Sequence, residues 1–172
     1  MSPGFDEGPL KAALRARKAG AEEAALALAE AKARKVSQGR PGDLVIGADQ
    51  GLECEGAWFD KPRDRNEARQ QLLALRGRTH RLLSAVAVAT DERVLWRHVE
   101  EARLTMRVFS DDFLESYLTR SGDDVLQSVG AYRLEGIGAQ LFQKIEGEYF
   151  TILGLPLFPL LDFLRNEGAV MR

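Results

Sequence analysis

The residues of this sequence that could do chemistry are a carboxylate and two lysines in separate segments. Asp49 follows the apolar run VIGA directly, where we expect a buried strand to end. Ligand-binding groups are common at such strand ends, although Asp49 could equally cap a turn. Lys61 in FDKP could hold a phosphate, orient Asp49 or be a solvated loop lysine. Lys32, beside an apolar helix face, could extend to water or point into a cleft.

Two more carboxylates lie in glycine-bounded loops, which supply binding residues more often than regular elements do. They are Glu7 in FDEG and Glu135 in YRLEGIG, and each could instead only solvate the surface. The segment GIGAQL begins like a dinucleotide-binding fingerprint, but Leu141 replaces its third glycine, so we predict no such site. The residues alone therefore indicate an acidic–lysine site of undetermined chemistry.

Composition limits the class of protein. The 172 residues suit a single domain, 1–172, and 45% hydrophobic with 29% charged residues exclude wholesale disorder. A net charge of −2 argues against a dedicated nucleic-acid binder. One cysteine, Cys54, cannot form an internal disulfide, and the N-terminus lacks the apolar core of a signal peptide. The apolar stretches fall short of the roughly 18 residues that a membrane span needs, so we expect a soluble cytoplasmic protein.

The pattern of elements predicts a mixed α/β fold with helices flanking a sheet. Helices are expected over 9–37 with a break at Gly20, from the cap Asp64 to about Arg76, from the cap Ser110, and over 155–168. Strands are expected at 43–50, in a hairpin turning near Glu55-Gly56, and in an antiparallel pair over 79–90 and 93–109. The glycine-rich stretch 129–150 matches no single regular element.

Taken in order, several short segments resemble one family. They are FDE near the start, LAEAKA, VIGADQ, FDKP, LLALRGRTH, AYRLEGIGAQLFQKIEGEY and ILGLPLFPLL, which together extend from about Phe5 to Gly168. No single segment is diagnostic, but their ordered combination is highly specific. The chain resembles the Maf family of nucleoside triphosphate pyrophosphatases, also described as septum-formation proteins.

The resemblance implies a Maf/ITPase-like two-lobed α/β fold with a central cleft. It also implies Mg²⁺-dependent hydrolysis of a nucleoside triphosphate to the monophosphate and pyrophosphate, which limits incorporation of non-standard nucleotides into nucleic acids. Asp49 matches the family's proton acceptor and is a candidate metal ligand, while Glu7, Lys32 and Lys61 match the cluster around the triphosphate. These residue types suit the reaction, which needs oxygen ligands, cations for phosphate and a base for water.

Two positions bear on the substrate. Gln50 and Glu135 resemble the subgroup associated with 7-methyl-GTP, whereas members acting on dTTP and UTP typically have threonine and glutamine there. Methylation at N7 places positive charge on the purine, and a carboxylate gains more from a charged base than a neutral amide does. A dTTP/UTP pyrophosphatase and a non-catalytic nucleotide-binding regulator of cell division remain the alternatives.

The resemblance departs from the family at the N-terminus. Family members usually begin with an apolar strand and a Ser-x-Ser-x-Arg-type phosphate loop upstream of FDE, whereas here Met1 lies almost next to FDE. We therefore expect either a misplaced start site or a shortened member that lacks this strand and loop, and the missing loop favours the non-catalytic alternative. The expected partners are a nucleoside triphosphate and, as is common among similar proteins, a second copy of the chain, with no nucleic acid or membrane.

Overall fold

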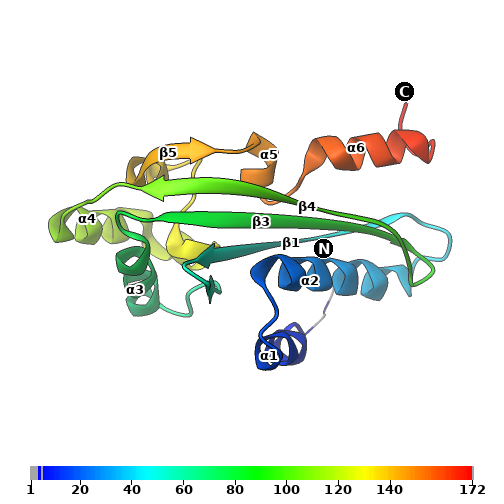
Figure 1. Cartoon of the computed structure of the whole chain (residues 1–172), viewed down its shortest axis with the longest axis horizontal. Coiled ribbons are helices and arrows are strands. Elements are labelled where there is room, and N and C mark those ends of the chain that lie inside the picture. The colour runs from blue at the N-terminus through cyan, green and yellow to red at the C-terminus, as the bar shows by residue number, and fades with distance from the viewer. Residues whose placement is uncertain (1–3, 5, 172) are drawn as a thin grey trace. The chain divides into compact units, whose positions relative to one another are not determined.

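The computed structural model describes residue 4 and residues 6–171 and confirms a mixed α/β fold (Figure 1). The helices are α1 (Gly8–Ala16), α2 (Ala21–Ser37), α3 (Arg65–Leu75), α4 (Asp111–Ser121), α5 (Tyr149–Ile152) and α6 (Leu157–Asn166). The strands are β1 (Val45–Cys54), β2 (Ala57–Phe59), β3 (Thr79–Thr90), β4 (Arg93–Met106) and β5 (Phe142–Glu146). Three 3₁₀ turns cover Gly122–Leu126, Val129–Ala131 and Ile137–Leu141. In the part of the chain so described, no helix is long and apolar enough to cross a membrane.

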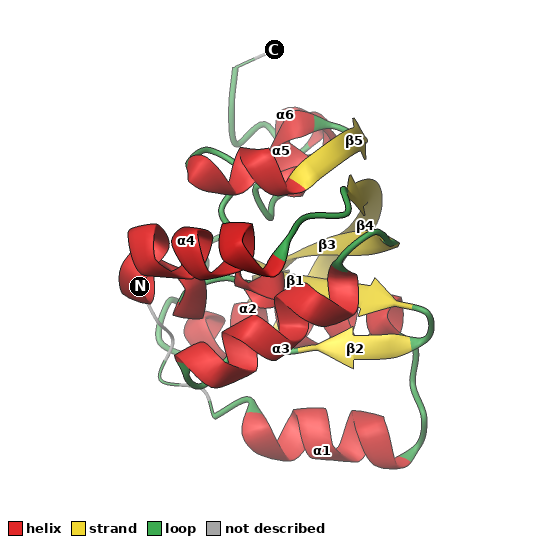
Figure 2. Ribbon diagram, turned by 90° about the vertical axis from the view of Figure 1, so that its left-hand side faces the viewer, coloured by secondary structure: helices red, strands yellow, loops and turns green. Residues whose placement is uncertain are grey.

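The five strands form one antiparallel sheet in the order β2-β1-β3-β4-β5. Figure 2 shows β2 beside β1. The two strands are joined by the predicted turn, in which Glu55 and Gly56 both have positive φ angles (52° and 82°). The chain divides into two compact units. Unit 1 contains the described residues up to Gln50 together with 83–101 and 148–171, and unit 2 contains 51–82 and 102–147.

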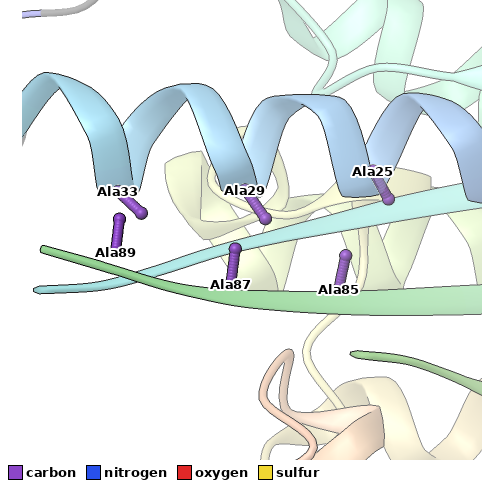
Figure 3. Packing of buried hydrophobic residues seen from close by; sticks show 6 residues of the cluster. All are labelled: Ala25, Ala29, Ala33, Ala85, Ala87 and Ala89. Carbon is purple, nitrogen blue, oxygen red and sulfur yellow. The ribbon is translucent and has the colours of Figure 1, made fainter. Parts of the chain in front are cut away.

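The core of unit 1 is built from alanines on one face of β3. Ala25, Ala29 and Ala33 of α2 point toward Ala85, Ala87 and Ala89 of β3 (Figure 3). Small side chains on both elements let a helix approach a sheet closely. The strand β1 also lies close to α2, because a Cβ atom on Gly47 would overlap the backbone of both Ala29 and Ala33. This packing fixes α2 beside the strand that bears Asp49.

The opposite face of β3 packs against α6, as the two-residue alternation of a strand requires. Val86 and Val88 form a cluster with Leu160, and Trp96 of β4 stacks on Phe163 with the ring centroids 5.0 Å apart. The terminal helix predicted near Pro156 is therefore confirmed, and its apolar side completes the core of unit 1.

Unit 2 confirms the helix caps that the sequence predicts. The Asp64 carboxylate accepts a hydrogen bond from the Glu67 amide (2.8 Å), and the Ser110 hydroxyl accepts one from the Phe113 amide (3.2 Å). The strand β5 was not predicted. It pairs antiparallel with β4, with Leu104 opposite Ile145.

Candidate active site

A single lysine bridges two carboxylates in unit 1. The ammonium of Lys32 lies 2.5 Å from Oδ1 of Asp49 and 2.8 Å from Oε1 of Glu7. A second lysine, Lys11, contacts the other carboxylate oxygen of Glu7 at 2.9 Å. The structure thus brings together three residues that the sequence analysis assigned to one site, and adds Lys11 to them.

Three elements position these groups. Lys32 comes from α2, and the close approach of Gly47 to that helix places Asp49, two residues further along β1, within its reach. Glu7 precedes α1, whose first turn is capped by the Asp6 carboxylate rather than by Glu7. The side chain of Glu7 is therefore left to the two lysines.

The sequence interpretation of Asp49 needs one correction. We expected a strand to end near Asp49, but β1 continues through it to Cys54, so the carboxylate lies in the middle of a strand of an antiparallel sheet. Residues 48–51 are all half-buried and Leu52 beyond them is buried again, so the apolar run ends at Ala48 without the strand ending there. The alternative that Asp49 caps a turn is wrong for the same reason.

Burial and pairing set the charge states of these groups. Burial raises the pKa of Asp49 above its ordinary value, and the opposing ion pair with Lys32 offsets this only in part. Burial would lower the pKa of Lys32, but its two carboxylate partners outweigh burial and raise it. For Glu7, burial is likewise outweighed by Lys32 and Lys11, which hold its pKa below the ordinary value. Asp49 is therefore the carboxylate of the cluster that takes up a proton most readily.

Next to Asp49, the side chain of Gln50 is held by its amide nitrogen. This nitrogen lies 2.9 Å from the Ser84 hydroxyl, 3.0 Å from the Ile152 carbonyl and 3.2 Å from the Thr151 carbonyl. The Ser84 hydroxyl itself donates to the Thr151 carbonyl at 2.6 Å. The sequence analysis missed Ser84 and Thr151. Nothing local marks them, since they lie 34 and about a hundred residues from Gln50.

The remaining predicted residues, Lys61 and Glu135, belong to unit 2. Lys61 is exposed in the loop between β2 and α3. Glu135 is exposed in the turn before Ile137–Leu141 and lines a polar cavity of about 330 Å³ together with Tyr117, Arg120 and Arg133. That these two residues share one site with Asp49 stays a prediction.

The carboxylates of Asp49 and Glu7 fit a magnesium ion. Within residues 4 and 6–171, no group of three or more His, Cys, Asp or Glu side chains could hold a metal by itself. Mg²⁺ does not require such a group, because it usually binds one or two carboxylates and completes its shell with water and substrate phosphates. Two carboxylates that already share one cation supply this type of donor set.

Comparison with known proteins gives a consistent family. The family model described as Maf-like protein matches residues 1–167. A nucleoside triphosphate pyrophosphatase of Caulobacter vibrioides is 57% identical over 99% of this chain and 85% of its own length, and one of Paramagnetospirillum magneticum is 55% identical over 96% and 86%. A 7-methyl-GTP pyrophosphatase of Mesorhizobium japonicum is 53% identical over 96% of this chain and 83% of its own. By these matches, the chain belongs to the Maf family.

Proposed function

We propose that this protein hydrolyses a nucleoside triphosphate to the monophosphate and pyrophosphate. The observation that carries the proposal is the bridge from Asp49 through Lys32 to Glu7, which combines a carboxylate of raised pKa with a cation. The names of the relatives in three bacteria support the same reaction. Nucleoside triphosphates are cytoplasmic metabolites, and we propose the cytoplasm as the compartment.

In the proposed reaction, Asp49 acts as the general base. Its carboxylate accepts a proton from a water molecule as the water oxygen bonds to the α-phosphorus, and the anhydride bond between the α- and β-phosphates breaks. Pyrophosphate leaves with the electron pair of that bond, and the proton on Asp49 passes to solvent. A carboxylate whose pKa is raised by burial is a stronger base once ionised, which suits this step.

Charge balance explains the other residues. Glu7 and Asp49 carry two negative charges, and Lys32 and Lys11 carry two positive ones, so a triphosphate would meet no net attraction from the cluster alone. A divalent cation on Asp49 and Glu7 would supply positive charge to the phosphates and polarise the bond to be broken. Lys61, an exposed lysine, is proposed to contact the phosphates as well.

For the base of the substrate, we propose 7-methylguanine, recognised by Glu135 and Gln50. The named 7-methyl-GTP pyrophosphatase among the relatives supports this choice. Glu135 lines a polar cavity and has an exposed carboxylate, which can accept from the N1 and N2 donors of the base and favours its positive ring. UTP and dTTP remain the alternative substrates.

The test is pyrophosphate release from 7-methyl-GTP, GTP, UTP and dTTP in the presence of Mg²⁺. Asp49→Asn keeps the shape of the side chain but removes the proton acceptor, so turnover should fall by about 10²-fold or more. Asp43→Asn is a matched control, because Asp43 is exposed and pairs with Arg40 at the surface, at 3.8 Å. Near-normal turnover by a folded Asp49→Asn variant would contradict the role of Asp49 as general base. If the parent protein binds a nucleotide but does not hydrolyse it, the result would favour the non-catalytic nucleotide-binding regulator.

A further inference from the structure

The amide of Gln50 can offer a ligand an acceptor but no free donor. A primary amide has two N–H donors and one carbonyl acceptor. Three acceptors surround its nitrogen, namely the Ser84 hydroxyl and the carbonyls of Thr151 and Ile152, at 2.9, 3.2 and 3.0 Å. Both donors are therefore used within the protein.

The environment also fixes which way the amide faces. Thr151 and Ile152 form the end of α5, where the last helix carbonyls lack partners inside the helix; the Thr151 carbonyl accepts from the Gly154 amide at 3.0 Å, and both carbonyls accept from the Gln50 nitrogen. Turning the amide over would set its carbonyl oxygen against these two carbonyls. The nitrogen must face α5, and Oε1 must face away from it.

Ser84 joins the two sides of this arrangement. Its side chain is fully buried, it donates to the Thr151 carbonyl at 2.6 Å, and its oxygen accepts from the Gln50 nitrogen. Thr151 is fully buried too, and its hydroxyl is anchored on Glu100 at 2.6 Å. The hydrogen-bonded chain from Glu100 to Gln50 passes through the fully buried Thr151 and Ser84, and networks of this kind are strongest away from water.

We infer that Ser84 is a positioning residue for substrate choice, because it holds Gln50 so that the substrate meets a hydrogen-bond acceptor and not a donor. The inference rests on the proposed function and adds to it the polarity that Gln50 presents. A base that places an N–H or NH₂ group toward Gln50 is favoured, and one that places a carbonyl there is disfavoured. Ser84 itself touches no substrate and takes no part in bond cleavage.

The experiment measures kcat/KM for 7-methyl-GTP and for UTP and compares their ratio between variants. Ser84→Ala removes one of the bonds that orient Gln50, so the ratio should move toward 1 by about three- to tenfold, the effect of one hydrogen bond. Ser84→Cys keeps a side chain of similar volume but makes a much weaker hydrogen bond, so it should change the kcat/KM ratio in the same direction as Ser84→Ala. Ser84→Thr keeps the hydroxyl and should restore the parent ratio.

Ser37→Ala is the matched control. Ser37 is a buried serine of the same unit whose hydroxyl also donates one hydrogen bond and accepts another, but between two backbone groups: it donates to the Arg34 carbonyl and accepts from the Glu92 amide. Its loss should lower stability to a similar degree and leave the ratio unchanged. If Ser84 acts through Gln50, then Ser84→Ala in a Gln50→Thr background should add nothing further to the ratio.

Three outcomes would overturn the inference while leaving the proposed function intact. In the first, Gln50→Thr changes the kcat/KM ratio but Ser84→Ala and Ser84→Cys keep the ratio of the parent. In the second, Ser84→Ala changes the ratio as much in the Gln50→Thr background as in the parent, and in the third, Ser37→Ala changes the ratio as much as Ser84→Ala does. If the parent chain releases no pyrophosphate from any triphosphate, the proposed function fails, and the inference fails with it.

Discussion

The imidazole of His80 and the hydroxyl of Tyr132 form a hydrogen bond of 2.7 Å in the interior of unit 2. His80 is fully buried, and within the described part of the chain its other ring nitrogen, Nδ1, has no hydrogen-bond partner. A protonated imidazole would carry a donor there with nothing to accept it. Burial accordingly lowers the pKa of His80 from 6.5 to about 4.

This pair makes the stability of the protein dependent on pH. Between about pH 6.5 and pH 4 the unfolded chain binds a proton at His80 that the folded chain does not, so stability is lost as the pH falls through this window. From pH 7 to pH 5 the loss due to His80 amounts to about 2 kcal/mol. Urea unfolding at the two pH values should show this loss in the parent and a smaller one in His80→Gln. The control is His98→Gln, at the other histidine, which stacks on Trp96. Equal losses in the parent and His80→Gln would contradict the prediction.

Lys32→Met should change the pH dependence of hydrolysis and not only its rate. The ion pair with Lys32 keeps the pKa of Asp49 from rising as far as burial alone would take it, and the Glu7 charge raises that pKa further. Without the ammonium, Asp49 should take up its proton at a higher pH, and the acid limb of kcat/KM should move upward by about 1 pH unit or more. Lys32→Arg retains the charge, so its acid limb should stay near that of the parent. An acid limb unmoved in Lys32→Met would mean that Asp49 is not the titrating base.

The close approach of β1 to α2 predicts a severe effect of a single methyl group. Gly47→Ala would force a Cβ atom into the backbone of Ala29 and Ala33, which cannot move without displacing the helix. We expect a loss of about 3 kcal/mol or more in the free energy of unfolding, at the upper end for overpacking. Gly39→Ala is the control, since the nearest atom to its added Cβ lies at 3.9 Å. A Gly47→Ala variant as stable as Gly39→Ala would show that the strand does not approach the helix this closely.

The double change Gln50→Thr, Glu135→Gln should move preference from 7-methyl-GTP toward UTP or dTTP. It removes a carboxylate that favours a positively charged base and an amide that offers an acceptor. The charge-assisted hydrogen bond is worth roughly 1.5–3 kcal/mol, which gives a ten- to hundredfold change in the kcat/KM ratio. Glu55→Gln offers a control, because Glu55 is exposed at the tip of the β1–β2 turn and pairs with Arg78. An unchanged ratio would remove both residues from the base site.

The parts of the fold that were predicted from the sequence are those whose causes are local. Asp64 and Ser110 cap helices through their own neighbours, and Glu55-Gly56 turns a hairpin by its backbone conformation alone. The strand β5 has four exposed residues out of five, so it lacks the apolar alternation that marks a strand, and only its pairing with β4 defines it.

The candidate site likewise has features that local sequence predicts and features that depend on contacts between distant segments. The carboxylates and lysines of the acidic–lysine site were found as residue types in motifs, and the structure brings Glu7, Lys32 and Asp49 together. Their geometry depends on Gly47, whose role arises only when α2 packs on β1. The partners of Gln50 come from β3 and α5, far apart in the sequence, and no local pattern indicates them.

The facing alanines of α2 and β3 bear on which mutations the protein can tolerate. Ala29, Ala33, Ala85, Ala87 and Ala89 are all fully buried, and none has a functional group. Any larger side chain among them would push away the helix that bears Lys32, and the distance from its ammonium to Asp49 would grow before the fold was lost. A saturation mutagenesis screen scored for activity should therefore find these chemically inert positions nearly as restricted as the charged ones. These positions would then reject larger side chains because they set the distance between the charges of Lys32 and Asp49.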